Sequence, residues 1–325
     1  MKSISVSKHT SFAEDVRLGL TSVPKCLSSK YFYDDEGSRL FQAIMKLPEY
    51  YLTRAEREIF QTQTSEIYQA FSSDHSAFDV IELGAGDGTK TALLMEYFLR
   101  QSTAFTYTPI DISQEAIDAL TGKFKADFPG LKMNAQKGDY FQILETLKTA
   151  STRRKILLFL GSNIGNFSRE QALKFFRHLR DVMNSDDLLL VGFDLQKDPR
   201  VIVQAYDDAQ GVTAEFNLNL LRRINRELGA DFDLDQFSHY AIYHPTEGAA
   251  RSFLISRAEQ EVFIKALQQR FHFKQWEAVF MEISQKYSVE MIDDFAAMSG
   301  FQVVRNFFDR QNYFTDSLWR LRNEN

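Results

Sequence analysis

Carboxylates and glycines follow three apolar stretches of the chain and are suited to holding a nucleoside. A glycine-rich turn, Gly-Ala-Gly-Asp-Gly at 84–88, follows the first stretch, and Asp111 ends the second. A carboxylate placed there can accept hydrogen bonds from both ribose hydroxyls, although it could equally serve a turn or a helix cap. Asp139 follows the third stretch, where it can accept an adenine amino hydrogen while the ring of Tyr140 packs on the base.

The charges beside the glycine turn select among nucleotides. Thr89 occupies the position of the last glycine of Gly-x-Gly-x-x-Gly, so the dinucleotide fingerprint fails. Glu82 and Asp87 flank the turn and would repel a pyrophosphate, whereas they suit a ligand that carries an ammonium or a sulfonium. We therefore infer S-adenosylmethionine as the nucleotide. The alternative is that the turn only reverses the chain.

Alternating strand and helix patterns position these residues. Apolar runs at 78–83, 105–112, 131–138, 155–160 and 187–195 predict strands, and helical patterns separate them. The fold class is therefore α/β, with a doubly wound, mostly parallel sheet. Ligands of such sheets lie at the carboxyl ends of the strands. The turn at 84–88, Asp111, Asp139 and Asn166 all fall at those ends.

A second domain interrupts this rhythm. Two helices (198–208 and 213–228) and antiparallel strands (237–243, 251–257 and 278–284) are expected there, before a helix at 289–300 and strands at 301–308 and 313–321 complete the first sheet. We expect a cofactor-binding domain of 55–196 and 287–325, and an inserted α+β substrate-binding domain of 8–54 and 197–286. Within the latter, residues up to about 30 read as a polar arm. Capping boxes of Thr53 with Glu56 and of Ser168 with Gln171 should each open a helix.

Composition narrows the partners and the compartment. The 325 residues carry a net charge of −6 without a basic block, which argues against nucleic acid and anionic membranes. The single cysteine, Cys26, excludes an internal disulfide and fits the cytoplasm, and no run approaches the roughly 20 apolar residues of a membrane span. We expect a cytoplasmic monomer that needs no metal.

Several motifs along the whole chain carry a family resemblance. They are Tyr-Asp-Asp-Glu-Gly-Ser-Arg-Leu-Phe at 33–41, Leu-Pro-Glu-Tyr-Tyr-Leu-Thr-Arg at 47–54, Phe-Leu-Gly-Ser-Asn-Ile-Gly-Asn at 159–166, Glu-Phe-Asn-Leu-Asn at 215–219, Arg-Glu-Leu-Gly-Ala-Asp-Phe at 226–232 and Glu-Ile-Ser-Gln-Lys at 282–286. With the glycine turn, they make the chain resemble the S-adenosylmethionine-dependent, histidine-specific Nα-methyltransferases of ergothioneine biosynthesis.

The resemblance assigns roles to particular residues. It implies that the cofactor is held by Gly84, Lys90, Asp111, Asp139 and Tyr140. It places Tyr33 near the methyl group and the accepting amine, as the catalytic candidate. Asn166 and Tyr206 would hold the carboxylate and amine end of the amino acid, and Tyr50, Glu282 and Ser284 would bind its imidazole.

The same residues have plainer interpretations. Tyr50 and Tyr51 could be packing residues, and Glu282 with Ser284 could form a solvated strand face, since the strand period of two puts them on one side. Ser252 stands where the family has a bulky apolar residue near the substrate. The predicted reaction is trimethylation of the α-amino group of L-histidine to hercynine. The alternatives are N-methylation of another aromatic amino acid, such as a tryptophan-type substrate, and a non-catalytic sensor of the cofactor or an amino acid.

Overall fold

The computed structural model describes residues 11–72, 77–138, 140–147 and 153–322. The chain divides into two compact units, made of Leu52–Gln196 with Gln285–Asn325 and of Met1–Tyr51 with Lys197–Ser284. We call them the doubly wound unit and the inserted unit. The sequence placed the corresponding boundaries at 54, 196 and 286.

The doubly wound unit contains an eight-stranded sheet with the order β12-β13-β6-β5-β1-β2-β3 and with β4 also paired to β2. Strand pairing is parallel from β6 to β3, and β13 runs antiparallel to both of its neighbours. Its strands are β1 (Phe78–Leu83), β2 (Thr106–Asp111), β3 (Lys132–Met133), β4 (Gln136–Lys137), β5 (Arg154–Phe159), β6 (Leu188–Asp194), β12 (Phe301–Phe308) and β13 (Phe314–Leu321). The predicted fold class is confirmed.

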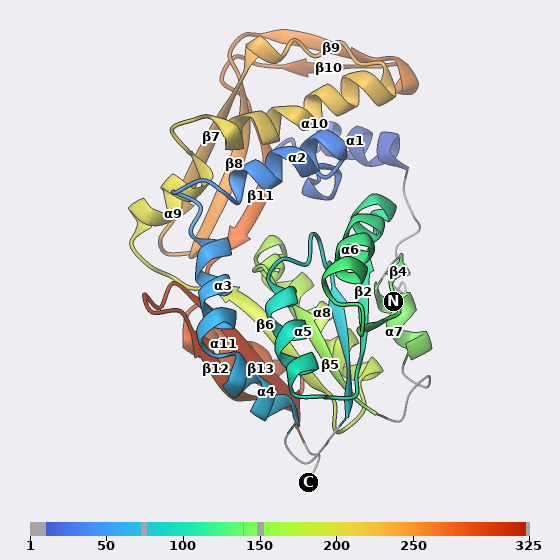
Figure 1. The fold of residues 1–325 in the computed structure, drawn as a ribbon. Coiled ribbons are helices and arrows are strands. Elements are labelled where there is room, and N and C mark those ends of the chain that lie inside the picture. The colour runs from blue at the N-terminus through green and yellow to red at the C-terminus, as the bar shows by residue number, and fades with distance from the viewer. Residues whose placement is uncertain (1–10, 73–76, 139, 148–152, 323–325) are drawn as a thin grey trace, which may run out of the picture. The chain divides into compact units, whose positions relative to one another are not determined.

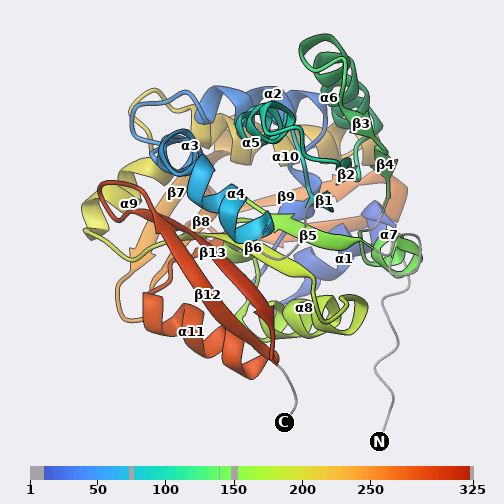
Figure 2. The ribbon, with the colours of Figure 1, turned by 60° about the horizontal axis from the view of Figure 1, so that its bottom comes forward.

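Helices cover both faces of this sheet, as Figure 2 shows for α4 and α5 on one side and α8 and α11 on the other. The helices are α3 (Leu52–Thr62), α4 (Thr64–Ser72), α5 (Thr91–Arg100), α6 (Gln114–Asp127), α7 (Tyr140–Leu147), α8 (Arg169–Val182) and α11 (Val289–Met298). Residues of α3 to α6 share a buried core with Phe78 and Val80, whereas α7, α8 and α11 pack with Ile81 and Leu83. Alternate residues of β1 thus face opposite layers, which explains why apolar residues occur on both faces of this strand.

The third predicted strand is broken. It forms β3 and β4, which pair with β2 in the same register on either side of a gap. The gap lies opposite Pro109, on the side of β2 from which Tyr107 O accepts from Asn134 N (2.9 Å) and Asp111 O from Gly138 N (3.0 Å). Proline has no N–H to donate there, so the ladder is interrupted.

The inserted unit combines helices with antiparallel strands. A three-stranded sheet has the order β11-β8-β7, and β9 and β10 form a separate two-stranded sheet. The elements, drawn in Figure 1, are α1 (Phe12–Thr21), α2 (Asp35–Ile44), α9 (Pro199–Tyr206), α10 (Val212–Leu228), β7 (Phe237–His244), β8 (Ala249–Ser256), β9 (Gln260–Ile264), β10 (Gln269–Phe273) and β11 (Ala278–Gln285). The predicted helices at 198–208 and 213–228 and the three predicted antiparallel strands are confirmed.

Two local expectations are wrong. The segment before residue 30 is not a plain polar arm, because Ser11 caps α1 and Val16 and Leu20 are buried. The capping box at Thr53 does not form, since α3 already begins at Leu52 and the Glu56 carboxylate is used elsewhere. The capping box of Ser168 and Gln171 at the start of α8 does form. No helix within the four described stretches of chain is long and apolar enough to cross a bilayer.

Candidate functional site

The glycine turn lies where β1 ends and is bonded to the end of β2. Gly84, Gly86 and Gly88 all have positive φ, a region that strains other residue types. Gly84 N donates to Ile110 O (2.8 Å). A Cβ at Gly88 would lie 2.9 Å from the side chains of α6. The turn therefore requires glycine both for its conformation and for its packing.

Asp111 lies beside this turn and holds it. Its carboxylate accepts from Gly86 N (3.3 Å) and from Ser113 N (2.9 Å), while the Ser113 hydroxyl caps α6. Asp111 is half-buried, so the residue is not fully enclosed by the turn. The alternative that Asp111 stabilises a turn is thus confirmed, because its carboxylate accepts from two backbone N–H groups. Binding of the ribose hydroxyls by the same carboxylate stays a prediction.

Glu82 does not act as the sequence argument assumed. It is 3 % exposed and accepts hydrogen bonds from Thr91 Oγ1 (2.7 Å) and from the Tyr107 hydroxyl. Burial raises its pKa to about 7, against the opposing effect of these two donors. Glu82 therefore stabilises the first residue of α5, Thr91, and does not present a charge to a ligand. Asp87, in contrast, is exposed and accepts from Thr89 N (2.9 Å).

Lys90 and the loop 161–166 lie next to the glycine turn. A Cβ on Gly161 would be 3.5 Å from Lys90 Nζ, and a Cβ on Gly84 would be 3.7 Å from Asn163 Nδ2. The loop ends in a short 3₁₀ turn, Asn163–Asn166, which leaves Asn166 half-buried. Gly84, Asp111 and Asn166 therefore lie at the carboxyl edge of the sheet, as the topology predicted, and Lys90 lies beside them.

The adenine candidates are only partly described. Tyr140 begins α7, and its ring packs against Phe141 (4.9 Å between centroids) and Phe175 (5.9 Å). Its packing on a base stays a prediction. Asp139 lies outside the described residues.

The inserted unit brings together the other five candidates, which are far apart in the sequence. The Tyr206 hydroxyl donates to Ser284 Oγ (2.7 Å). Desolvation, followed by the charge of Glu282 and by Tyr50 and Tyr206, raises the pKa of Tyr33 well above its ordinary value. Tyr33 is 44 % exposed, so water offsets part of the desolvation, but the effect of Glu282 still shows that the two side chains are near each other. A solvated strand face is excluded for Ser284, which is 6 % exposed.

Aromatic rings join Tyr33 to Tyr50. Phe41 lies 5.5 Å from the Tyr33 ring and 6.1 Å from the Tyr50 ring, and Phe216 lies 5.7 Å from Tyr33. Tyr50 is 9 % exposed and does pack, as the plainer interpretation expected. Phe216 was not among the predicted site residues. Its place in Glu-Phe-Asn-Leu-Asn, a motif with no role assigned, was the signal that could have identified it.

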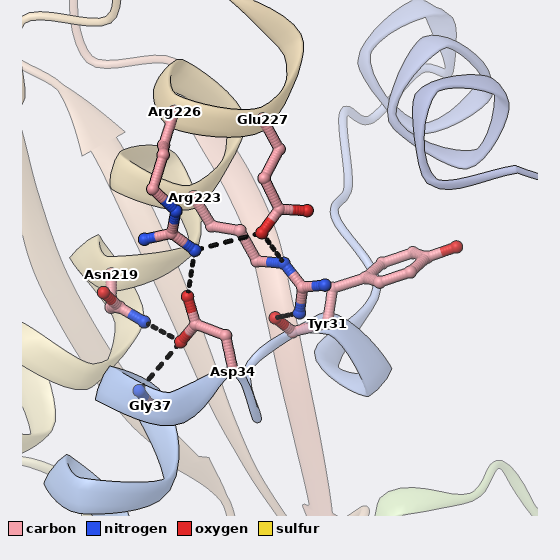
Figure 3. Close-up of polar contacts among 7 residues, drawn as sticks. All are labelled: Tyr31, Asp34, Gly37, Asn219, Arg223, Arg226 and Glu227. Atoms are coloured by element: carbon pink, nitrogen blue, oxygen red, sulfur yellow. Dashed lines mark hydrogen bonds and ion pairs between the residues drawn. The ribbon is translucent and has the colours of Figure 1, made fainter. Parts of the chain in front are cut away.

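Asp34 anchors the segment that carries Tyr33 (Figure 3). Its carboxylate caps α2 by accepting from Gly37 N (2.8 Å), and it also accepts from Asn219 Nδ2 (2.7 Å) and Arg226 Nη2 (2.6 Å) of α10. Burial works to raise the pKa of Asp34, but these donors outweigh it and lower that pKa. Residues of three family motifs thus meet at one carboxylate directly after Tyr33.

A neighbouring arginine holds the chain just before Tyr33. Arg223 Nη1 donates to Tyr31 O (3.0 Å), and its guanidinium lies over the rings of Phe12 (5.0 Å) and Tyr31 (5.7 Å). Glu227 accepts from both Arg223 and Arg226 at 3.0 Å (Figure 3). Tyr33 is therefore held on both sides along the chain by α10.

His239 of β7 is hydrogen-bonded to the backbone of Tyr206. Its Nε2 lies 2.9 Å from the Tyr206 carbonyl oxygen, which can only accept, so we assign the proton to Nε2. Burial lowers the pKa of His239 despite that bond, and the ring is neutral near pH 7. The C-terminal end of α9 is thereby held against β7.

Ser252 is 2 % exposed on β8, opposite Ala241 of β7. Two small side chains therefore face each other at this point of the sheet. No group of three or more histidine, cysteine, aspartate or glutamate side chains that could hold a metal occurs in the part of the chain that the structure describes.

Known proteins resemble this chain over nearly its whole length. The family model described as histidine-specific methyltransferase, SAM-dependent, matches residues 12–321. A histidine N-alpha-methyltransferase of Mycolicibacterium smegmatis is 38 % identical over 94 % of this chain and 93 % of its own, and one of Mycobacterium tuberculosis is 36 % identical over 95 % of both. Ergothioneine biosynthesis protein 1 of Schizosaccharomyces pombe is 28 % identical over 88 % of this chain and 38 % of its own. The sheet order, the glycine turn and these matches agree, and the chain belongs to the family of histidine-specific, SAM-dependent methyltransferases.

Proposed function

We propose that this protein transfers methyl groups from S-adenosylmethionine to the α-amino group of L-histidine and forms the trimethyl betaine hercynine, the first step of ergothioneine biosynthesis. The observation that carries the proposal is the gathering of Tyr33, Tyr50, Tyr206, Glu282 and Ser284 in the inserted unit of a chain from this family. A carboxylate and several hydroxyls surrounded by rings suit a small aromatic zwitterion.

The cofactor is assigned to the doubly wound unit. Gly84 gives the backbone its close approach, Asp111 takes the ribose hydroxyls, and Lys90 faces the cofactor beside the turn. Asp139 and Tyr140 take the adenine. The bound sulfonium supplies an electrophilic methyl group, so the protein's own task is to place the accepting nitrogen in line with it.

Substrate recognition follows from the side-chain chemistry. Glu282 accepts a hydrogen bond from an imidazole N–H. Ser284 Oγ already accepts a hydrogen bond from the Tyr206 hydroxyl, so its own O–H remains able to donate to the same ring. Tyr50 packs on the imidazole. We assign the carboxylate and amine end of histidine to Asn166 and Tyr206.

The reaction needs orientation more than acid–base chemistry. Holding two reactants in an attack geometry contributes roughly 7–11 kcal/mol. The candidate residues include no histidine, and Lys90 is paired with Glu56. An α-amino group is mostly protonated near pH 7, so its proton passes to water before each transfer. The rings of Tyr33, Phe41 and Phe216 suit the growing quaternary ammonium.

Tyr33 acts in this scheme as a hydroxyl and not as a base, because its raised pKa keeps it protonated. We expect Tyr33→Phe to lower kcat at least about 10-fold, the effect of losing one hydrogen bond near the developing cation. Single-turnover rates at saturating cofactor and histidine measure this. An unchanged rate would remove the hydroxyl from the mechanism, and a raised KM alone would assign it to binding.

Incubation of the purified chain with labelled S-adenosylmethionine and a panel of amino acids tests the function. We expect mono-, di- and trimethylated histidine by mass spectrometry, and a kcat/KM for tryptophan that is at least about 10-fold lower, because indole leaves polar groups of the site unpaired. The small pair Ser252 and Ala241 favours a second candidate, a larger aromatic amino acid, which would reverse this ranking. Binding without any product would support a sensor instead.

Location and assembly stay predictions. We propose a cytoplasmic monomer without nucleic-acid or membrane partners, on the grounds of the net charge of −6 and the single cysteine. The reaction as proposed needs no metal.

A further inference from the structure

We propose that Glu56 is a positioning residue that sets both Lys90 and the loop 161–166 for ligand binding. The inference rests on the proposed function, because it takes Lys90 and Asn166 as ligand-binding residues. Glu56 lies two residues after the motif at 47–54. The sequence predicted only a helix-capping role for it.

Each carboxylate oxygen of Glu56 serves a different segment. Oε2 pairs with Lys90 Nζ, and Oε1 accepts from Gly161 N (2.7 Å). Glu56 thus joins α3 to the residue that precedes α5 and to the loop that follows β5. Because that loop ends at Asn166, one side chain influences a cofactor candidate and a substrate candidate together.

The surroundings of Glu56 are shaped around its carboxylate. A Cβ on Gly192 of β6 would lie only 2.6 Å from Glu56 Oε1, so a side chain there would displace the carboxylate. Gly161, whose N–H donates to Glu56 Oε1, has a φ of +74°, a backbone conformation that favours glycine. Gly192 therefore makes space for the carboxylate, and Gly161 allows the backbone conformation of the loop that the carboxylate contacts.

The pair is enclosed on the side of Glu56 and open on the side of Lys90. The Glu56 side chain is 1 % exposed, whereas that of Lys90 is 21 % exposed. A lysine side chain free in solvent samples many rotamers, and fixing it costs conformational entropy. Glu56 removes that freedom before a ligand arrives, and the remaining exposed part of Lys90 is what a ligand can contact.

A second buried acid, Asp316, lies near the Glu56–Lys90 pair. Asp316 of β13 is fully buried, and its pKa is raised well above the ordinary value first by burial and then by the charge of Glu56, against the effect of Lys90. Burial and the nearby carboxylate of Glu56 therefore favour the neutral form of Asp316, and the charged partner of Glu56 is Lys90.

Glu56→Gln tests the inference. The amide oxygen of glutamine still accepts from Gly161 N, but the charge that fixes Lys90 is gone. We expect the dissociation constant for S-adenosylhomocysteine, measured by calorimetry, to rise at least about 10-fold, the size of one lost charge-assisted contact. KM for S-adenosylmethionine should rise in parallel. A merely structural role of Glu56 would lower the melting temperature and leave both constants unchanged.

Matched variants separate the explanations. Glu58→Gln lies on the same helix and breaks a surface pair with Arg310 (3.2 Å), and it should leave binding unchanged. Asp316→Asn, which mimics the protonated acid, should do the same. In Glu56→Gln/Lys90→Met, the loss should not exceed that of Lys90→Met alone, because both changes remove one interaction.

The outcomes are distinguishable from failure of the proposed function. If the unaltered protein binds S-adenosylhomocysteine but does not methylate histidine, the function is wrong while the Glu56 measurement is still decisive. If Glu56→Gln binds S-adenosylhomocysteine as tightly as the unaltered protein, the inference is wrong. Should Glu56→Gln not fold, Glu56→Asp retains the charge on a shorter side chain that cannot reach both partners. Its unchanged affinity would equally overturn the inference.

Discussion

Glu282→Ala is expected to raise the dissociation constant for histidine roughly 10- to 100-fold. A hydrogen bond to a charged group contributes about 1.5–3 kcal/mol, and each 1.4 kcal/mol is a factor of about ten in affinity. Glu282 is half-buried next to Tyr33, so water replaces the lost contact only partly. Calorimetry with histidine in the presence of S-adenosylhomocysteine measures the change.

Two controls give this result its meaning. Affinity for S-adenosylhomocysteine alone should stay the same in Glu282→Ala, because the cofactor candidates belong to the doubly wound unit. Glu261→Ala removes an exposed glutamate from β9 of the inserted unit and should leave histidine binding intact. Histidine affinity that does not change in Glu282→Ala would contradict imidazole recognition by this residue.

Lys286→Met is expected to lower the free energy of unfolding by about 3–5 kcal/mol, the usual cost of stranding one member of a buried ion pair. Lys286 Nζ lies 2.7 Å from Asp194 Oδ2, and both side chains are 0 % exposed. After the change, Asp194 must either remain charged without that partner or take up a proton. Urea unfolding followed by circular dichroism measures the loss.

The double variant Lys286→Met/Asp194→Leu separates the ion pair from simple loss of packing. Since two apolar side chains replace a buried pair at little cost, the double variant should recover most of the lost stability. Lys174→Met, which breaks an exposed pair with Glu170 in α8 (2.7 Å), should change stability by less than about 1 kcal/mol. A loss for Lys286→Met as small as that for Lys174→Met would show that the buried pair contributes little.

Local sequence patterns were sufficient to predict elements whose signals lie within a few residues of one another. The apolar runs of β1, β5 and β6 and the capping box of Ser168 were predicted because their partners lie within a few residues or in a periodic pattern. The family resemblance, and not a local pattern, implied which residues would form the substrate site. The hairpin of β9 and β10 was missed although Val262, Phe263 and Ile264 form an apolar run there, since such a short run is also compatible with a loop.

The sequence by itself therefore determined the order of the elements, the family motifs and the types of residue at the strand ends. Only the tertiary structure decided which charges are buried and with what they pair. Glu56 was predicted to be part of a helix cap, but it contacts Lys90 and Gly161. Glu82 was predicted to present its charge to the ligand, but it is buried and accepts from Tyr107 and Thr91. The physical reason is that burial and pairing depend on segments distant along the chain, which a local pattern does not contain.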